Sequence, residues 1–168
     1  TMSWSALQAV AEVIGAIAVV ASLVYLAIQV RQNTRAVRAA TYDAMVRSSA
    51  DFLDPLIRDG SLARLFETVT NDWADPRVTE EDRTRAMYLL TQMFRTWENV
   101  FYQSRQATLE PWLWEAWETV MLSYFHQPGI GAWWEGRRTA YSEPFRQFLE
   151  TSDPPSVRIR TTEELRAG

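Results

Sequence analysis

The feature that most constrains this chain is an apolar run near its start, EVIGAIAVVASLVYLAIQVRQ, over residues 12–32. From Val13 to Val30 it holds roughly 18 uncharged residues, or about 27 Å of helix, close to the bilayer hydrocarbon thickness of about 30 Å. The run is apolar on every face, whereas a surface helix carries a polar stripe. The alternative is a fully buried core helix. We expect a single transmembrane helix.

The two flanks of this run differ in charge. No arginine occurs in residues 1–11, whereas Arg31, Arg35 and Arg38 follow the run directly. The positive-inside rule places the arginine side in the cytoplasm, and these side chains either set topology or contact lipid headgroups. A cleaved signal peptide is disfavoured, because the segment before the run lacks positive charge and no A-x-A-like site follows it. We expect the N-terminus outside and the rest of the chain in the cytoplasm.

Small and weakly polar residues form one stripe along the run. They are spaced by alternating threes and fours and comprise Gln8, Ala11, Gly15, Ala18, Ser22, Tyr25 and Gln29. Small side chains let helices approach closely in lipid, and a period of about 3.5 residues indicates a left-handed packing seam. We predict docking on another membrane helix; the alternative is that Ala and Gly are simply common in apolar segments. Glu12 is either an interfacial residue or a polar element of the helix interface or of an ion path.

Composition limits the classes of function. The chain has no cysteine, which excludes disulfides and thiolate metal sites. Its net charge is −4, from 21 acidic and 17 basic residues, which argues against general nucleic-acid binding because phosphate contacts need a basic face. After the anchor about 120 residues remain, which suffices for one compact domain with a modest core. Seven of the eight tryptophans lie in that part of the chain.

The remaining sequence has a helical period. Neither Gly nor Pro interrupts residues 31–54, so the anchor and this segment are predicted to form one helix. Apolar periodicity and start signals, including Ser61 and Thr79 as N-caps, predict further helices at 62–71, 79–108, 111–126, 131–140 and 143–150. The predicted fold is all-α, with a membrane anchor helix at 1–30, a cytoplasmic helical domain at 31–150 and a flexible tail at 151–168.

Four stretches carry a resemblance to known proteins. They are the run EVIGAIAVVASLVYLAIQVRQNTRAVRAATY, then WENVFYQ at 97–103, then AWWEGRR and SEPFRQFLE within 132–150. With them the chain resembles a widespread group of uncharacterised bacterial proteins with one N-terminal membrane helix and a small helical domain. The resemblance implies the bacterial inner membrane as the location and agrees with the all-α fold. It implies no activity and no catalytic residues.

No pattern of catalytic residues is found in the sequence. The lone His126 and the lack of cysteine exclude ordinary zinc sites, and a di-iron bundle would need two Glu-x-x-His elements that this sequence lacks. Nucleophile-elbow, P-loop and dinucleotide motifs are missing too, and Gly129-Ile130-Gly131 is typical of a turn. We therefore expect no enzyme activity, no cofactor and no metal.

Two polar features of the helical domain have alternative interpretations. Glu98 lies among aromatic positions, so it is predicted to form a structural ion pair with Arg95, Arg105 or Arg137, rather than to bind a ligand. The residues Trp133, Trp134, Arg137 and Arg138 either form an aromatic and guanidinium surface for a partner, or place one tryptophan in the core with the other partly exposed.

These expectations lead to three hypotheses of function. The first is a non-enzymatic, single-pass accessory or scaffold subunit that docks on other membrane helices and braces a larger membrane complex. The alternative is a self-associating homo-oligomer, such as a channel or a sensor, whose anchor helices meet along the stripe. A membrane-tethered enzyme is the third. The expected partners are the lipid bilayer and other membrane subunits or a second copy of the chain, without nucleic acid.

Overall fold

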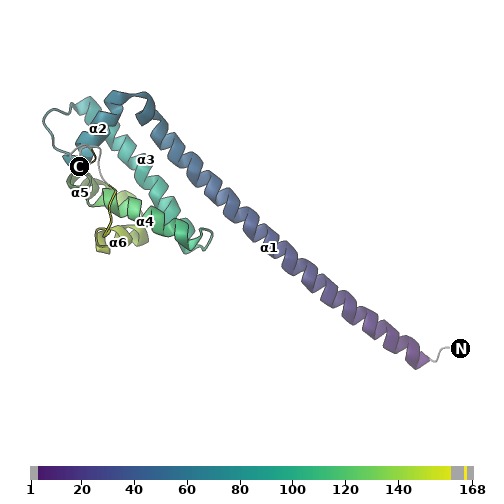
Figure 1. Cartoon of the computed structure of the whole chain (residues 1–168). Helices are drawn as coiled ribbons and strands as arrows, with labels where there is room; N and C mark the ends of the chain where they lie inside the picture. The colour runs from purple at the N-terminus through teal and green to yellow at the C-terminus, as the bar shows by residue number, and fades with distance from the viewer. Residues whose placement is uncertain (1–3, 160–164, 166–168) are drawn as a thin grey trace. The chain divides into compact units, whose positions relative to one another are not determined.

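The computed structural model describes the backbone of residues 4–159 and of residue 165, with the side chains of residues 5–7, 10 and 11 outside the described part. The described residues form six α-helices and one short 3₁₀ helix, and they contain no strand (Figure 1). The chain divides into two compact units, Thr1–Ala40 and Thr41–Gly168. The all-α fold predicted from the sequence is therefore confirmed.

Helix α1 (Trp4–Arg58) is one uninterrupted helix that holds the apolar run and then becomes the first helix of the bundle. This single helix confirms the predicted continuity. Its physical reason is that no Gly or Pro occurs between the apolar run and Pro55. The helix continues past Pro55 for about one turn, and the Asp59 backbone N–H donates to the Pro55 carbonyl at 3.0 Å. Pro55 lacks an N–H of its own, so it costs one intrahelical bond without ending the helix.

Helices α2 (Gly60–Asn71) and α3 (Glu80–Arg105) both begin at a side-chain cap. Thr79 caps α3 as predicted, because its hydroxyl accepts from the Asp82 N–H at 3.1 Å. The prediction of Ser61 as the cap of α2 is wrong. Asp59 holds that position, and its carboxylate accepts from the Ser61 N–H at 2.8 Å. A carboxylate two residues earlier offers the stronger acceptor. The hydrogen bonds that it accepts from Ser61 hold the pKa of Asp59 below its ordinary value.

The last four elements are α4 (Pro111–Phe125), α5 (Pro128–Arg137), the 3₁₀ helix η1 (Arg138–Ala140) and α6 (Glu143–Thr151). Each of the three α-helices has a proline in its first turn, where the missing N–H needs no partner. The sequence prediction placed Pro128 in a break and began the helix at residue 131. The structure instead uses Pro128 as the start of α5.

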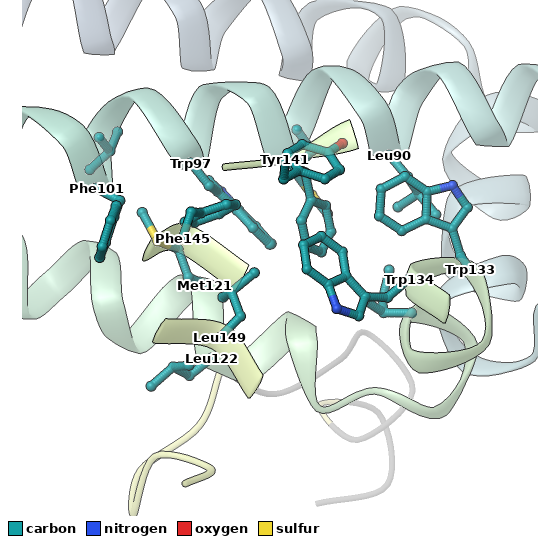
Figure 2. Close-up of a cluster of buried hydrophobic side chains, with 14 of the residues drawn as sticks. Leu90, Trp97, Phe101, Met121, Leu122, Trp133, Trp134, Tyr141, Phe145 and Leu149 are labelled. Carbon is teal, nitrogen blue, oxygen red and sulfur yellow. The ribbon is translucent and has the colours of Figure 1, made fainter. Parts of the chain in front are cut away.

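Aromatic side chains of α3, α5 and α6 form much of the core, together with aliphatic side chains such as Met121 and Leu122 of α4 (Figure 2). Phe94 is fully buried, and its ring centroid lies 4.8 Å from those of both Trp97 and Trp133 and 5.3 Å from that of Trp134. Such tilted and offset ring pairs add to the burial of apolar area. The abundance of tryptophan in this part of the chain is thus explained in large part by the core.

Gly129 sets how closely α5 approaches α2. A Cβ at this position would lie 2.0 Å from the Val69 carbonyl oxygen and 2.7 Å from that of Thr70. These are backbone atoms, which cannot rotate away as a side-chain end can. Only glycine fits between the two helices here, so the residue that was interpreted as part of a turn is a packing residue.

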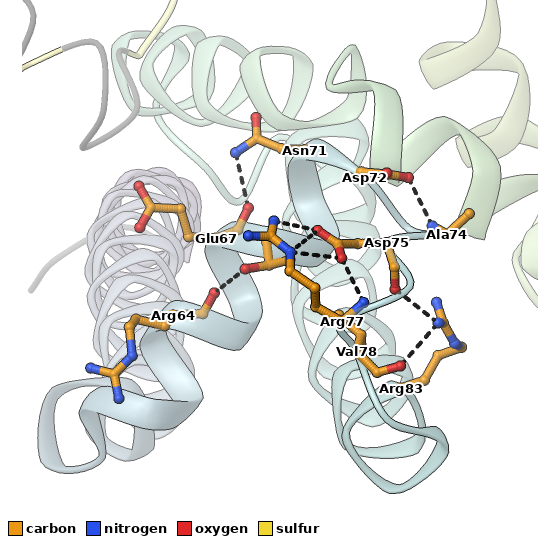
Figure 3. A network of polar contacts seen from close by, with 10 residues as sticks. Arg64, Glu67, Asn71, Asp72, Ala74, Asp75, Arg77, Val78 and Arg83 are labelled. Atoms are coloured by element: carbon orange, nitrogen blue, oxygen red, sulfur yellow. Dashed lines mark hydrogen bonds and ion pairs between the residues drawn. The ribbon is translucent and has the colours of Figure 1, made fainter.

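The loop between α2 and α3 is held by charged groups (Figure 3). Asp75 is buried, and its carboxylate accepts from the Arg77 guanidinium at 2.6 Å and from the Arg77 backbone N–H at 2.8 Å. These bonds lower the pKa of Asp75 to about 2. Arg83 of α3 donates to the carbonyls of Trp73, Asp75 and Val78. The loop is therefore fixed to the first turn of α3 without regular secondary structure.

Candidate membrane-helix interface

The predicted stripe lies on a single continuous helical stretch of α1. All of its positions, with Glu12 beside them, belong to that helix, and the side chain of Ala11 lies outside the described residues. The other stripe residues are exposed, and a Cβ added at Gly15 would meet nothing within 4 Å. The described stripe residues therefore lie on one continuous helix and are exposed on it. Their docking on another membrane helix stays a prediction.

The polar side chains inside the apolar run bond within the helix. Ser22 Oγ donates to the Ala18 carbonyl at 2.8 Å, and Gln29 Nε2 donates to the Tyr25 hydroxyl at 2.8 Å. In hydrocarbon, a polar group without a partner is costly, and local bonds of this kind reduce that cost. The bond from Gln29 uses one N–H of its amide, whose second N–H and carbonyl oxygen take no part in it.

The apolar side chains between Val13 and Val30 are exposed around the whole helix. Leu23, for example, is 61% exposed and Ile17 is 63% exposed. Among the described residues, α1 contains the one stretch that is long and apolar enough to cross a membrane, and none of that stretch is buried in the structure. The same length and composition also fit a signal sequence near an N-terminus.

The arginines after the run are exposed along α1. Arg31, Arg35 and Arg38 all have exposed side chains, and the hydroxyl of Thr34 donates to the Val30 carbonyl at 2.9 Å. Long guanidinium side chains at the end of an apolar segment can reach the headgroup layer. Their position marks the boundary of the apolar stretch.

The prediction that Trp133 and Trp134 form part of a partner surface is wrong. Trp133 and Trp134 are both buried, at 3% and 2% exposure, and both pack on Phe94. Trp134 Nε1 donates to Glu150 at 2.9 Å, and the other oxygen of that carboxylate accepts from Arg138 at 2.8 Å. The alternative of one exposed tryptophan is also wrong. Gly129 brings α5 close to α2, so both indoles of this short helix enter the core.

The ion pair predicted for Glu98 is present and joins α3 to the start of α6. Arg95 donates to Glu98 at 2.7 Å, the Ser142 backbone N–H donates to the other carboxylate oxygen at 2.7 Å, and Arg95 also donates to the Ala140 carbonyl at 2.8 Å. Burial raises the pKa of Glu98, but the bonds from Ser142 and Arg95 outweigh it and hold that pKa below its usual value. Glu98 therefore has a structural role.

In the described part of the chain, no group of three or more His, Asp or Glu side chains is arranged so that it could hold a metal ion. The one histidine, His126, follows α4, and its Nε2 lies 3.1 Å from the carbonyl oxygen of Ser152. A carbonyl only accepts, so this nitrogen carries the proton. The residue joins the end of α4 to the end of α6, and no nucleophile is placed beside it in this contact.

Sequence reasoning missed an apolar pocket of the helical domain. It has a volume of about 330 Å³ and lies between the C-terminal part of α1, α3 and α4. Leu53, Trp97, Trp117 and Ile159 are among its lining residues. The first three matched the period of a buried helix face, and that pattern is the same whether the side chains meet each other or leave a space. Ile159 falls in the segment that was predicted as a flexible tail.

No protein-family model, curated protein or solved structure matches this chain. The fold and the properties of α1 are therefore the observations on which a functional interpretation can rest.

Proposed function

We propose that this protein is a non-enzymatic, single-pass protein of the bacterial inner membrane that serves as an accessory or scaffold subunit of a larger membrane complex. The observation that supports it is the segment between Val13 and Val30, where apolar side chains are exposed on all sides and the hydroxyl and amide groups bond within the helix. Water is an unfavourable solvent for such a surface, whereas lipid is a favourable one. In this proposal the helical domain lies in the cytoplasm.

The stripe is the proposed docking face for other membrane helices. Within lipid there is no hydrophobic driving force between helices, so association depends on close packing of small residues. Gly15 and Ala18 provide that close approach, and Gly15 has open space beside it. Ser22 already bonds within the helix and Gln29 uses one amide N–H in the same way, so close packing of the small residues is the main basis of recognition in this proposal.

The continuity of α1 gives the proposed subunit a mechanical role. An uninterrupted helix has no flexible linker between the apolar run and the bundle, so a membrane partner bound to the stripe is coupled through the backbone to the domain. The domain would then brace the assembly to which the helix docks. The proposal includes membership of the bacterial group that the anchor sequence resembles.

Gly15→Leu tests this proposal, with Ala16→Leu as the matched control. Both substitutions add a large apolar side chain to the same helix, but only the first lies on the stripe. We expect Gly15→Leu to reduce co-purification of membrane partners at least tenfold and Ala16→Leu to leave it near the wild-type level. Extraction in a mild detergent followed by native mass spectrometry measures the assembly.

Three results would contradict parts of the proposal. Recovery of the full-length protein from the soluble fraction without detergent would overturn the membrane location. A pure homo-oligomer would replace the accessory role with the self-associating alternative. Equal assembly by the Gly15→Leu and Ala16→Leu proteins would remove the stripe as the docking face.

A further inference from the structure

We propose that the helical domain binds a single hydrocarbon chain in the pocket between the C-terminal part of α1, α3 and α4. This inference concerns the unit Thr41–Gly168 by itself and does not rest on the proposed membrane function. The pocket volume of about 330 Å³ falls within the range of about 300–1,000 Å³ that is usual for small-ligand sites. At about 30 Å³ for a small group such as water, its volume corresponds to roughly ten carbon-sized groups.

The walls of the pocket are apolar and come from three helices. Leu53 lies on α1, Met93 and Trp97 lie on α3, and Leu113 and Trp117 lie on α4. Aromatic and aliphatic side chains on several helices form a surface that water wets poorly, and apolar ligands gain free energy by replacing that water. The lining therefore favours a ligand made of CH₂ groups.

The serine and threonine hydroxyl groups in the lining are already used by the protein. Ser49 Oγ donates to the Met45 carbonyl at 2.9 Å, and Thr96 Oγ1 donates to the Gln92 carbonyl at 3.1 Å. Thr96 Oγ1 also lies 2.9 Å from Ser48 Oγ. Among the described lining residues, Tyr124 has the one titratable side chain, and burial raises the pKa of its phenol. The pocket thus provides no charged group for an ionic ligand.

One edge of the pocket already takes up an aliphatic side chain of the protein itself. Ile159 lines the pocket, and its backbone N–H donates to Ser123 Oγ of α4 at 3.1 Å. Ser123 in turn donates to the Thr119 carbonyl at 2.6 Å. A branched alkyl side chain is therefore held in the lining by a backbone hydrogen bond to α4, and the pocket volume remains for a longer, unbranched chain.

Photolabelling of the full-length protein with a diazirine-bearing decanol tests the proposal. Ser49→Leu and Ala116→Leu place a larger side chain into the pocket from opposite walls, on α1 and α4. Ala50→Leu is the matched control, since Ala50 is the exposed neighbour of Ser49 and does not line the pocket. We expect label on pocket residues in the wild-type and Ala50→Leu proteins, and at least a tenfold loss in both pocket-filling variants. Circular dichroism identifies any variant that fails to fold. If one of the two pocket-filling variants fails, the labelling of the other one tests the proposal.

Competition by unlabelled alcohols adds a second measurement that does not depend on mutation. Each added methylene should strengthen binding about fourfold, as expected for burial of one CH₂ group. The increase should stop near ten carbons, where the pocket is full, whereas partition into bulk lipid continues to increase with chain length. A phospholipid with the diazirine at its tail shows whether the chain comes from a bilayer lipid or from a free molecule.

The proposal is overturned if both filling variants retain wild-type labelling. It is also overturned if the label lies only within residues 13–30, or if affinity continues to increase beyond dodecanol. Any of these results would mean that the probe dissolves in lipid or on the surface rather than in the pocket.

Discussion

The apolar segment of α1 and the core of the helical domain are made of the same residue types, yet they use them in opposite ways. Leu23 of the segment is 61% exposed, whereas Leu90 of the bundle is fully buried. The bundle covers its apolar surface with its own helices. The segment leaves its apolar surface uncovered, so another phase or another molecule has to cover it. Composition therefore does not distinguish the two regions, but the way they are covered does.

Polar groups show the same contrast. In the apolar segment, Ser22 and Gln29 bond one turn away on the same helix. In the bundle, Glu98 accepts from Ser142, which lies 44 residues further along the chain. Local bonds make a helix self-sufficient, while distant bonds make each helix depend on the others. The segment can thus form its hydrogen bonds alone, whereas the bundle must fold as a unit.

The largest expected effect comes from the same substitution made in both regions. Leu90→Ala should lower the free energy of unfolding of the bundle by about 2–5 kcal/mol, because it removes a fully buried side chain and leaves a cavity. Leu23→Ala should change it by less than about 0.5 kcal/mol, since that side chain is exposed. Urea unfolding followed by tryptophan fluorescence measures both. If Leu23→Ala lowered the free energy of unfolding as much as Leu90→Ala does, the contrast between the two regions would be contradicted.

Substitution of two glycines on α5 should have opposite effects. Gly129→Ala should destabilise the bundle by about 1–3 kcal/mol, because the new Cβ overlaps the backbone of α2. Gly131→Ala, two residues along, should stabilise it by about 0.5–1 kcal/mol, because that position has open space and Ala favours the helix. The difference in thermal midpoint between the two variants measures this contrast. An unchanged thermal midpoint for Gly129→Ala would contradict the close approach of α5 to α2.

The smallest expected effect is a dependence of bundle stability on acid pH that comes from Asp75. Its pKa in the folded protein is about 2, below the ordinary value of 3.8, so its contribution is complete above about pH 4 and is lost as pH falls towards 2. Asp75→Asn should flatten this part of the stability profile, measured by urea unfolding from pH 5 to pH 2. Arg77→Gln should flatten it as well. An unchanged slope in both variants would exclude the Asp75–Arg77 bond as its source.

Helix positions could be predicted from the sequence because their signals are local. The continuity of α1 follows from the absence of breakers, and Thr79 caps α3 because Asp82 lies within reach of its hydroxyl. Errors occurred where two local signals competed, as at Asp59 and Ser61. The start of α5 at Pro128 was also missed, since a proline fits both a break and a first helical turn.

Predictions that depended on distant neighbours were less successful. Two interpretations were open for Trp133 and Trp134, a partner surface or one indole in the core with the other partly exposed. Whether an indole is exposed depends on how α5 packs, which the segment AWWEGRR does not encode by itself. The ion pair of Glu98 was predicted together with its three candidate partners. The structure selected Arg95 and added Ser142, which no spacing rule on α3 could supply. The pocket was missed for the same reason.

The sequence by itself determined the helices, the uninterrupted α1 and the stripe along its apolar run, because these depend on residues within a few turns of one another. Only the tertiary structure decided that both indoles of α5 are buried, that Gly129 allows α5 to approach α2, and that α1, α3 and α4 leave a space of about 330 Å³. Periodicity defines which face of a helix is apolar. What covers that face depends on the positions of other helices, which are set by packing across the whole domain.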